Sequence, residues 1–240
     1  MGTDGRMVWV PAGEVVEGRL IDRPNRYLAH VELDGMVVAA HVPNPGRMTE
    51  LMIAGRTVHL RPAAHAERKT AWDLLGVMHD TPDGPVPVCI DNRLGGRLAR
   101  LALEQHAIEA LPEYGEVRAE VKWGASRLDF RLAADPPIWV EVKSCTLVDD
   151  GHGRFPDAPT LRGTRHLGEL TALVAEGQRA AALFVIQRED ARSVGPNDET
   201  DPDFGQALRA ASAAGVILLA VRCAWSPAGL QLRGSIPVFT

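Results

Sequence analysis

Three ionisable residues in two neighbouring segments have types and spacings that suit phosphodiester hydrolysis. Glu141 and Lys143 lie two residues apart in the segment PIWVEVKS, so on a β-strand their side chains project from the same face. Asp129 lies in the middle of the segment SRLDFRLA, a short connection upstream. If the two segments pair antiparallel, Asp129 comes next to Glu141. Two carboxylates at the centre of a sheet suit a hard cation such as Mg²⁺ or Mn²⁺, which binds carboxylates together with substrate phosphate oxygens.

The lysine of this group stands out because the chain uses arginine almost throughout. It contains 23 Arg and three Lys, which are Lys69, Lys122 and Lys143. An ammonium is compact and can lose its proton, whereas a guanidinium effectively cannot. We therefore predict Asp129, Glu141 and Lys143 as catalytic residues, with Asp129 and Glu141 as the metal ligands and Lys143 acting on the attacking water. The alternative is a structural Glu141–Lys143 ion pair beside an unrelated surface aspartate.

The segments around these residues predict an α/β domain in the second half of the chain. A helical pattern at 97–110 stops before Pro112, and three extended stretches follow at 116–123, 126–133 and 137–144. A helix at 163–176, an apolar strand at 180–186, a helix at 202–214 and an apolar strand at 215–221 complete the pattern, with a mobile loop expected at 195–203. Apolar strands flanked by helices indicate a mixed sheet covered on both faces. This order, with the Asp129…Glu141-x-Lys143 spacing, resembles the core of the PD-(D/E)xK nucleases.

The first 90 residues have a different pattern, which predicts short strands separated by turns. Three strand-like stretches occupy 14–43, with Asp34-Gly35 as a hairpin turn between the second and the third, and further strands precede Asp91. This rhythm predicts a small OB-like β-barrel. The expected architecture is therefore an α+β chain of two domains, an OB-like barrel at 1–90 and a nuclease-like domain with a mixed central sheet at 91–240.

Basic and polar residues at predicted loop ends and helix starts are candidates for contacts with nucleic-acid phosphates. In the barrel these are Arg23, Asn25, Arg26, Arg47, Arg68 and Lys69, and in the second domain they are Arg127, Arg162, Arg165 and His166. Ordinary solvated arginines, and a capping or core role for His166, are the alternatives. Asp157 is either a further acidic group of the site or a turn residue.

Composition narrows the class of protein. The net charge is −5, so nucleic-acid binding would need a local basic patch. Three cysteines without CxxC spacing indicate neither a disulfide framework nor a structural zinc site, and we expect all three to be buried. There is no apolar run long enough to span a bilayer and no signal-peptide pattern, so the expected location is cytoplasmic.

Several longer motifs resemble the sugar fermentation stimulation protein A (SfsA) family. They include RPNRYLAHVELDG, HVPNPGRM, EVKSCTLVDDG, FPDAPTLRGTRHLGEL and DPDFGQALRAASAAGV, spread over residues 23–216. The resemblance implies a DNA-binding protein with an OB-like domain, a nuclease-like domain and a link to maltose and sugar metabolism. This chain departs from the family pattern at Leu101, where a helix Glu is usual, and at Arg165, where a Lys is usual. Glu104, one turn after Leu101, is a possible substitute for the missing carboxylate.

Two functions remain after this comparison. The first is a Mg²⁺- or Mn²⁺-dependent nuclease acting on DNA without strong sequence preference, which the Asp-Glu-x-Lys set favours. The second is a non-catalytic DNA-binding regulator of sugar metabolism that keeps the nuclease fold, which Leu101 favours. A small-molecule enzyme has little support, because no glycine-rich phosphate loop or nucleotide-binding fingerprint is present.

Overall fold

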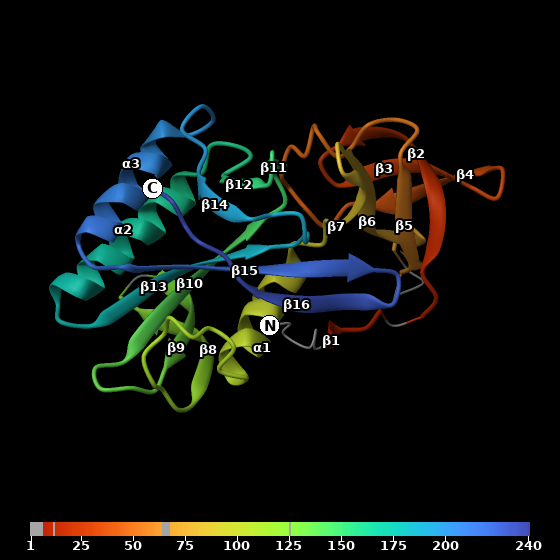
Figure 1. The fold of residues 1–240 in the computed structure, drawn as a ribbon. Coiled ribbons are helices and arrows are strands. Elements are labelled where there is room, and N and C mark those ends of the chain that lie inside the picture. Colours follow the sequence, from red (N-terminus) through yellow and green to blue (C-terminus); the bar gives the residue numbers. More distant parts are fainter. Residues whose placement is uncertain (1–6, 12, 64–67, 125) are drawn as a thin grey trace.

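The computed structural model describes residues 7–11, 13–63, 68–124 and 126–240. Its N-terminal part is a closed barrel of five strands, drawn in red to dark yellow in Figure 1. The strands are β2 (Val16–Asn25), β3 (Leu28–Leu33), β4 (Met36–His41), β5 (Thr57–Pro62) and β6 (Trp72–Thr81). They are ordered β4-β3-β2-β5-β6, and a parallel pairing of β4 with β6 closes the barrel. β7 (Gly84–Cys89) forms a hairpin with β6. This is the OB topology that the sequence predicts.

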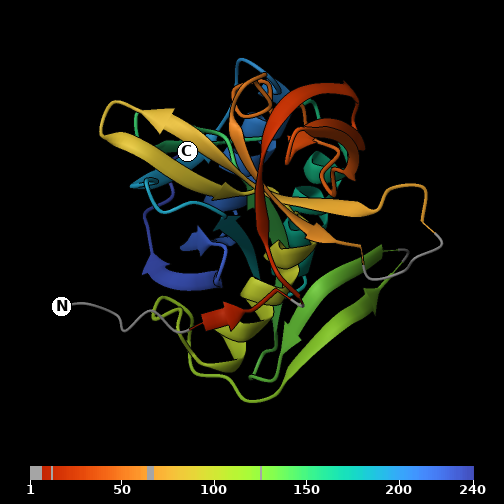
Figure 2. The same cartoon turned by 90° about the vertical axis from the view of Figure 1, so that its right-hand side faces the viewer.

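The C-terminal part is built on a mixed sheet of seven strands with the order β1-β16-β15-β13-β10-β9-β8. The strands are β1 (Met7–Trp9), β8 (Val117–Trp123), β9 (Ser126–Leu132), β10 (Ile138–Cys145), β13 (Arg179–Ile186), β15 (Ile217–Ser226) and β16 (Gly229–Ser235). The central strands β10, β13 and β15 run parallel, and the outer strands join them in antiparallel pairs. Figure 2, viewed from the barrel side, shows β8 and β9 as a long hairpin at one edge of the sheet.

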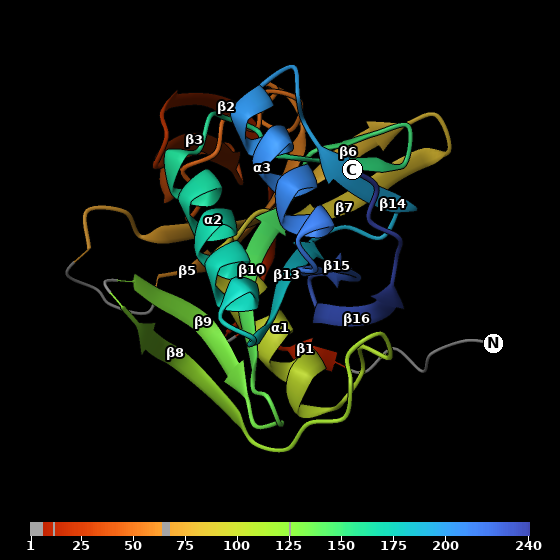
Figure 3. The same ribbon diagram turned by 90° about the vertical axis from the view of Figure 1, so that its left-hand side faces the viewer.

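Helices cover both faces of this sheet, as the apolar central strands require. α1 (Arg93–Glu104) packs on the face that carries Val140, and α2 (Leu161–Ala175) and α3 (Pro202–Ala213) pack side by side on the other face (Figure 3). A small second sheet contains β11 (Val148–Asp149), β12 (His152–Phe155) and β14 (Ser193–Pro196). No helix within the described part of the chain is long and apolar enough to cross a membrane.

Two predicted segments differ from the structure. The first helix begins at Arg93 and ends at Glu104, not at 97 and 110. It includes Gly95, which lies directly against Ser144 of β10, and it ends before His106, whose φ is +51°. The expected mobile loop at 195–203 is instead an anchored connection. Its Asp201 is buried, and the carboxylate accepts hydrogen bonds from the backbone N–H groups of Thr160 and Phe204, which ties the loop to both helices.

The two parts meet through a packed interface. Trp225 of β15 is buried against β6 at Gly76, and its indole nitrogen lies 3.5 Å from Nδ1 of His59 on β5. The buried Gln187 donates to the backbone carbonyls of Cys89 and Asp91, where the chain passes from β7 to α1. The predicted division at residue 90 falls at this passage. β1, however, pairs with β16, so the barrel itself begins only with β2.

Candidate active site

Strands β9 and β10 bring the three predicted catalytic residues together. The antiparallel ladder between the two strands ends at the pair of Val140 with Phe130. Beyond this pair, the side chain of Asp129 bonds to the neighbouring strand in place of a backbone group. Its Oδ2 accepts a hydrogen bond from the backbone N–H of Val142 over 2.7 Å. Asp129 is therefore fixed beside the strand that carries Glu141 and Lys143, and it is not an unrelated surface residue.

Glu141, Lys143 and His166 form a buried polar cluster between β10 and α2. Their exposed fractions are 4%, 7% and 2%. Lys143 Nζ donates to Glu141 Oε1 over 2.7 Å, and His166 Nδ1 contacts the same oxygen. Arg162, one turn earlier on α2, donates through Nε to His166 Nε2 over 3.4 Å. This bond assigns the ring proton to Nδ1, which can then donate to Glu141.

The cluster leaves negative charge without full compensation. Glu141 Oε2 is buried and has no hydrogen-bond partner within the described residues. Burial, together with the nearby charge of Glu141, raises the pKa of Asp129 to about 6, although the Val142 N–H and Lys143 act in the opposite direction. Two carboxylates held this close in a low-dielectric setting favour a proton or a cation between them.

Asp129 and Glu141 are the residues that could hold a divalent cation. In the described ranges, no group of three or more His, Cys, Asp or Glu side chains is arranged to hold a metal ion. Mg²⁺ accepts a smaller protein set, because it keeps several waters and takes phosphate oxygens from its substrate. The orphaned Oε2 of Glu141 and the raised pKa of Asp129 fit a cation of this kind.

Helix α1 does not supply the missing third carboxylate. It packs on the sheet face of Val140 and Val142, whereas Glu141 and Lys143 point to the face that α2 covers. Glu104 is exposed and forms an ion pair with Arg100 over 2.7 Å. The suggestion that Glu104 replaces the carboxylate absent at Leu101 therefore finds no support in this geometry.

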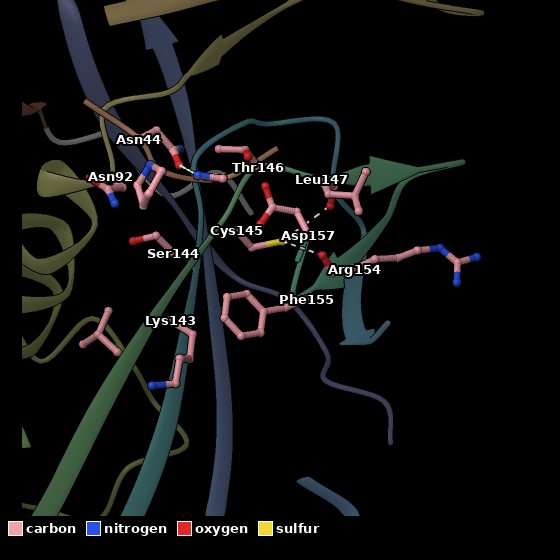
Figure 4. Close-up of a pocket in the computed structure, with 13 residues that line it drawn as sticks. Asn44, Asn92, Lys143, Ser144, Cys145, Thr146, Leu147, Arg154, Phe155 and Asp157 are labelled. Carbon is pink, nitrogen blue, oxygen red and sulfur yellow. Dashed lines mark hydrogen bonds between the residues drawn. The ribbon is translucent and has the colours of Figure 1, made fainter. Parts of the chain in front are cut away.

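A cavity of about 260 Å³ opens beside Lys143, between the two parts of the molecule (Figure 4). We call it the interdomain cavity. Its walls are the barrel turn at 44–46, Asn92 at the start of α1, residues 142–147 of β10 and the following segment, and Arg154, Phe155 and Asp157. Of these wall residues, only Lys143 and Asp157 are candidates from the sequence, because the segment around Phe155 has no periodic pattern from which its surroundings could be inferred.

Four of the predicted nucleic-acid contacts gather around a second, more open depression of about 370 Å³ on the barrel. This depression, the barrel hollow, is lined by Arg23, Asn25, Arg26, Gly46, Arg47, Thr49 and Met52. Arg26 and Arg47 are accessible at its rim. The Arg23 guanidinium instead donates to the backbone carbonyls of Arg26, Asn44, Gly46 and Arg47. Arg23 therefore shapes the hollow, and Arg26 and Arg47 supply its accessible charge.

The remaining predicted contacts are scattered. Arg68 is bound to the buried Asp73 over 2.8 Å, next to the exposed Lys69, on the connection between β5 and β6. Arg127 forms an ion pair with Glu120 across the β8–β9 hairpin, and Lys122 lies opposite Arg127 in the ladder. Glu120 lies between the paired residues Ala119 and Val121 and has a φ of +57°.

On α2, the predicted contact residues divide between the surface and the interior. Arg162 and Arg165 are accessible, and Arg165 lies 3.5 Å from Glu169. His166 is buried against Glu141, so it faces the carboxylates and not the surface that a nucleic acid could reach. Its role as a direct nucleic-acid contact is therefore corrected to that of a neighbour of Glu141.

Comparison with known proteins gives a consistent result over the whole chain. Residues 21–90 match the family model described as the SfsA N-terminal OB domain, and residues 93–229 match the sugar fermentation stimulation protein RE domain. The sugar fermentation stimulation protein homolog of Moorella thermoacetica is 43% identical over 97% of this chain and 99% of its own length. The homolog of Symbiobacterium thermophilum is 44% identical over 91% of this chain and 92% of its own length. A solved structure described as that of Pyrococcus furiosus SfsA in complex with Ca²⁺ has a TM-score of 0.85 and 27% identity, and the match covers 98% of this chain and 100% of that one. The chain therefore belongs to the sugar fermentation stimulation protein family.

Proposed function

We propose that this protein is a nuclease that uses Mg²⁺ or Mn²⁺ to cleave phosphodiester bonds, with DNA as its substrate and without strong sequence preference. The observation that carries the proposal is the convergence of Asp129, Glu141 and Lys143, of which Lys143 lines the interdomain cavity. A structural ion pair alone would not require the additional, destabilised carboxylate of Asp129. The orphaned Oε2 of Glu141 is likewise costly unless something binds it.

Each of these residues has a role that follows from its contacts. Asp129 and Glu141 would hold the cation, which when bound supplies positive charge to the phosphate and lowers the pKa of a water. Lys143 donates to Glu141 and lines the cavity, so it would hold the attacking water and receive or return its proton. His166, held by Arg162, keeps the Glu141 carboxylate in a fixed orientation.

Two further observations support the proposal. The Pyrococcus furiosus SfsA structure is described as a complex with Ca²⁺, another hard cation that prefers oxygen ligands. The barrel hollow contains Arg26 and Arg47, and it adjoins the interdomain cavity because Gly46 lines both. Positive charge there could bind the backbone of a nucleic acid whose scissile phosphate lies at Lys143.

A second candidate function is a non-catalytic DNA-binding regulator of sugar metabolism. Leu101 favours it, because the usual helix carboxylate is absent, and so does His166, because its contact occupies one oxygen of Glu141. The names of the relatives refer to sugar fermentation, not to cleavage. In this case the same fold would bind DNA while Asp129 and Glu141 serve only structure.

A cleavage assay separates the two functions. Plasmid, linear duplex, single-stranded DNA and RNA are incubated with the purified protein and Mn²⁺, in parallel with Lys143→Arg and Asp129→Ala. We expect wild type to cut at least one substrate and both variants to lose most activity, because arginine keeps the charge of Lys143 but cannot be deprotonated. If the variants cut as well as wild type, or nothing is cut, the nuclease proposal fails and the regulator is the better description.

A further inference from the structure

The interdomain cavity contains an aromatic ring beside the candidate catalytic lysine. Phe155 lines the cavity and is only partly buried, and Figure 4 draws its ring in the same space as Lys143 and Asp157. The ring also makes T-shaped contacts with two core phenylalanines, Phe184 at 5.8 Å and Phe204 at 5.0 Å between ring centroids. Phe155 is therefore held in one orientation, and a flat partner could stack on it with little loss of side-chain entropy.

The charges along the cavity differ from one end to the other. Lys143 supplies a cation at one end, and Figure 4 shows its amine pointing away from the carboxylate of Asp157. Asp157 lies against the barrel turn, so close that a Cβ on Gly46 would stand 2.3 Å from its Oδ2. At the Lys143 end the ammonium, which also donates to Glu141, offers a phosphate a hydrogen-bond donor, whereas the Asp157 carboxylate repels a phosphate. A base, which carries N–H donors, suits the Asp157 end.

Asn92 adds a polar group to the cavity wall. It occupies the N-cap position of α1, where asparagine normally accepts a backbone hydrogen bond, yet its side chain makes no cap bond to this helix. The role of a cap therefore does not account for its amide, which can donate to and accept from a ligand in the cavity.

The size of the cavity limits what can enter. At roughly 30 Å³ for each water in the liquid, its volume of about 260 Å³ is the room of about nine waters. This room is comparable with what a single nucleobase of about ten non-hydrogen atoms needs. The walls come from both parts of the molecule, which are joined by the buried Trp225 and Gln187, so the cavity is part of a packed interface.

We propose that the interdomain cavity binds one unpaired nucleotide, with its base stacked on Phe155 and hydrogen-bonded by Asp157 and Asn92, while the adjoining phosphate lies at Lys143. The preferred ligand is therefore single-stranded nucleic acid, or a duplex with an unpaired nucleotide, and not an intact duplex. The rest of the strand follows the short path over Gly46, which lines both this cavity and the barrel hollow. The placement of the phosphate at Lys143 rests on the proposed function. The inference itself concerns binding and can be tested without cleavage.

The test measures binding by fluorescence anisotropy in EDTA, where no metal-dependent cleavage occurs. Three labelled ligands of one sequence are compared: a single strand, a perfect duplex and a duplex with one bulged nucleotide. We expect the single strand and the bulged duplex to bind more tightly than the perfect duplex. Phe155→Leu, which keeps an apolar side chain against the core, should weaken binding of the single strand about 5- to 150-fold, the range of one base–aromatic stack. Phe155→Tyr should stay close to wild type.

A matched control and a second readout keep the test decisive. Phe239→Leu removes an exposed ring, 58% accessible, that lies outside the cavity, and it should not change affinity. If Phe155→Leu does not fold, a wild-type photo-crosslink with a 5-iodouracil strand replaces it, and the crosslinked peptide should contain Phe155. Equal affinity for strand and duplex, an unaffected Phe155→Leu, or crosslinks confined to other peptides would overturn the inference. The nuclease proposal would then still stand or fall by its own cleavage assay.

Discussion

Asp129 is held in a place that opposes its own ionisation. The hydrogen bond from Val142 fixes the carboxylate beside Glu141, while burial and the charge of Glu141 raise its pKa to about 6. In the unfolded chain the same group titrates near its ordinary value of 3.8. Without a cation the folded protein therefore binds a proton that the unfolded chain has already lost, and folding becomes less favourable as the pH rises from about 4 to about 6.

We therefore expect Asp129→Asn to stabilise the metal-free protein. The amide oxygen can still accept from Val142, and the charge is gone. The raised pKa corresponds to an upper limit of about 3 kcal/mol above pH 7, so the expected gain is about 1–3 kcal/mol at pH 7.5 and less at pH 5. Urea unfolding in EDTA at both pH values measures it. An Asn variant that is less stable at both values would show that the carboxylate is not destabilised.

The sequence pattern predicts that these residues lie together but does not predict all of their partners. Strand alternation placed Glu141 and Lys143 on one face, and the short connection predicted Asp129 beside them. The hydrogen bond that the Val142 backbone N–H donates to Asp129 depends on where the β9–β10 ladder ends, which the sequence pattern does not give. The contact between His166 and Glu141 depends on how α2 is rotated over the sheet.

Among the contacts between elements, β6 and β15 meet at a point where only glycine fits. A Cβ on Gly76 would stand 2.2 Å from Nε1 and 2.9 Å from Cε2 of Trp225, and the indole is buried and cannot move aside easily. The close approach brings the barrel against the C-terminal sheet and so sets the position of one wall of the interdomain cavity relative to the other.

Gly76→Ala should therefore destabilise the protein by about 1–3 kcal/mol, the usual cost of overpacking a core. Gly96→Ala is the matched control. It lies in α1, where an added Cβ would meet open space, so it should be neutral or stabilise by up to about 1 kcal/mol. Combining Gly76→Ala with Trp225→Phe should recover part of the loss. Thermal unfolding compares these variants with wild type, and a Gly76→Ala protein as stable as wild type would contradict the close packing.

The strands around the site were predictable because each has a periodic or fully apolar pattern. The pairing of β1 with β16 could not be predicted, since these strands are far apart in the sequence and neither has a pattern that indicates its partner. The surroundings of Phe155 could not be predicted either, because its neighbours are far from it in the sequence. Its segment contains Gly and Pro residues, and its neighbours come from α3, β13 and the barrel turn.

Over the molecule as a whole, positive charge is local and not general. The net charge is −5, and the barrel hollow collects Arg26 and Arg47 beside the interdomain cavity. Arg23 lies in the same hollow, but its guanidinium is committed to backbone carbonyls. Binding of nucleic acid and hydrolysis at Lys143 would then depend on different residues, and the two should be separable by substitution.

We expect Arg47→Ala and Arg26→Ala each to weaken binding of all sequences to a similar degree, because phosphate contacts carry no sequence information. Each lost contact should also make the plot of log affinity against log salt shallower by about one ion. Lys143→Ala should keep most of the affinity while losing any cleavage.

The control is Arg100→Ala, which replaces an exposed arginine on α1 that pairs with Glu104, and it should change neither affinity nor salt dependence. Anisotropy titrations of a single-stranded and a duplex ligand over a range of salt concentrations provide the measurement. An affinity that does not depend on salt, or one that falls as much with Arg100→Ala as with Arg47→Ala, would show that the barrel hollow is not where the nucleic-acid backbone binds.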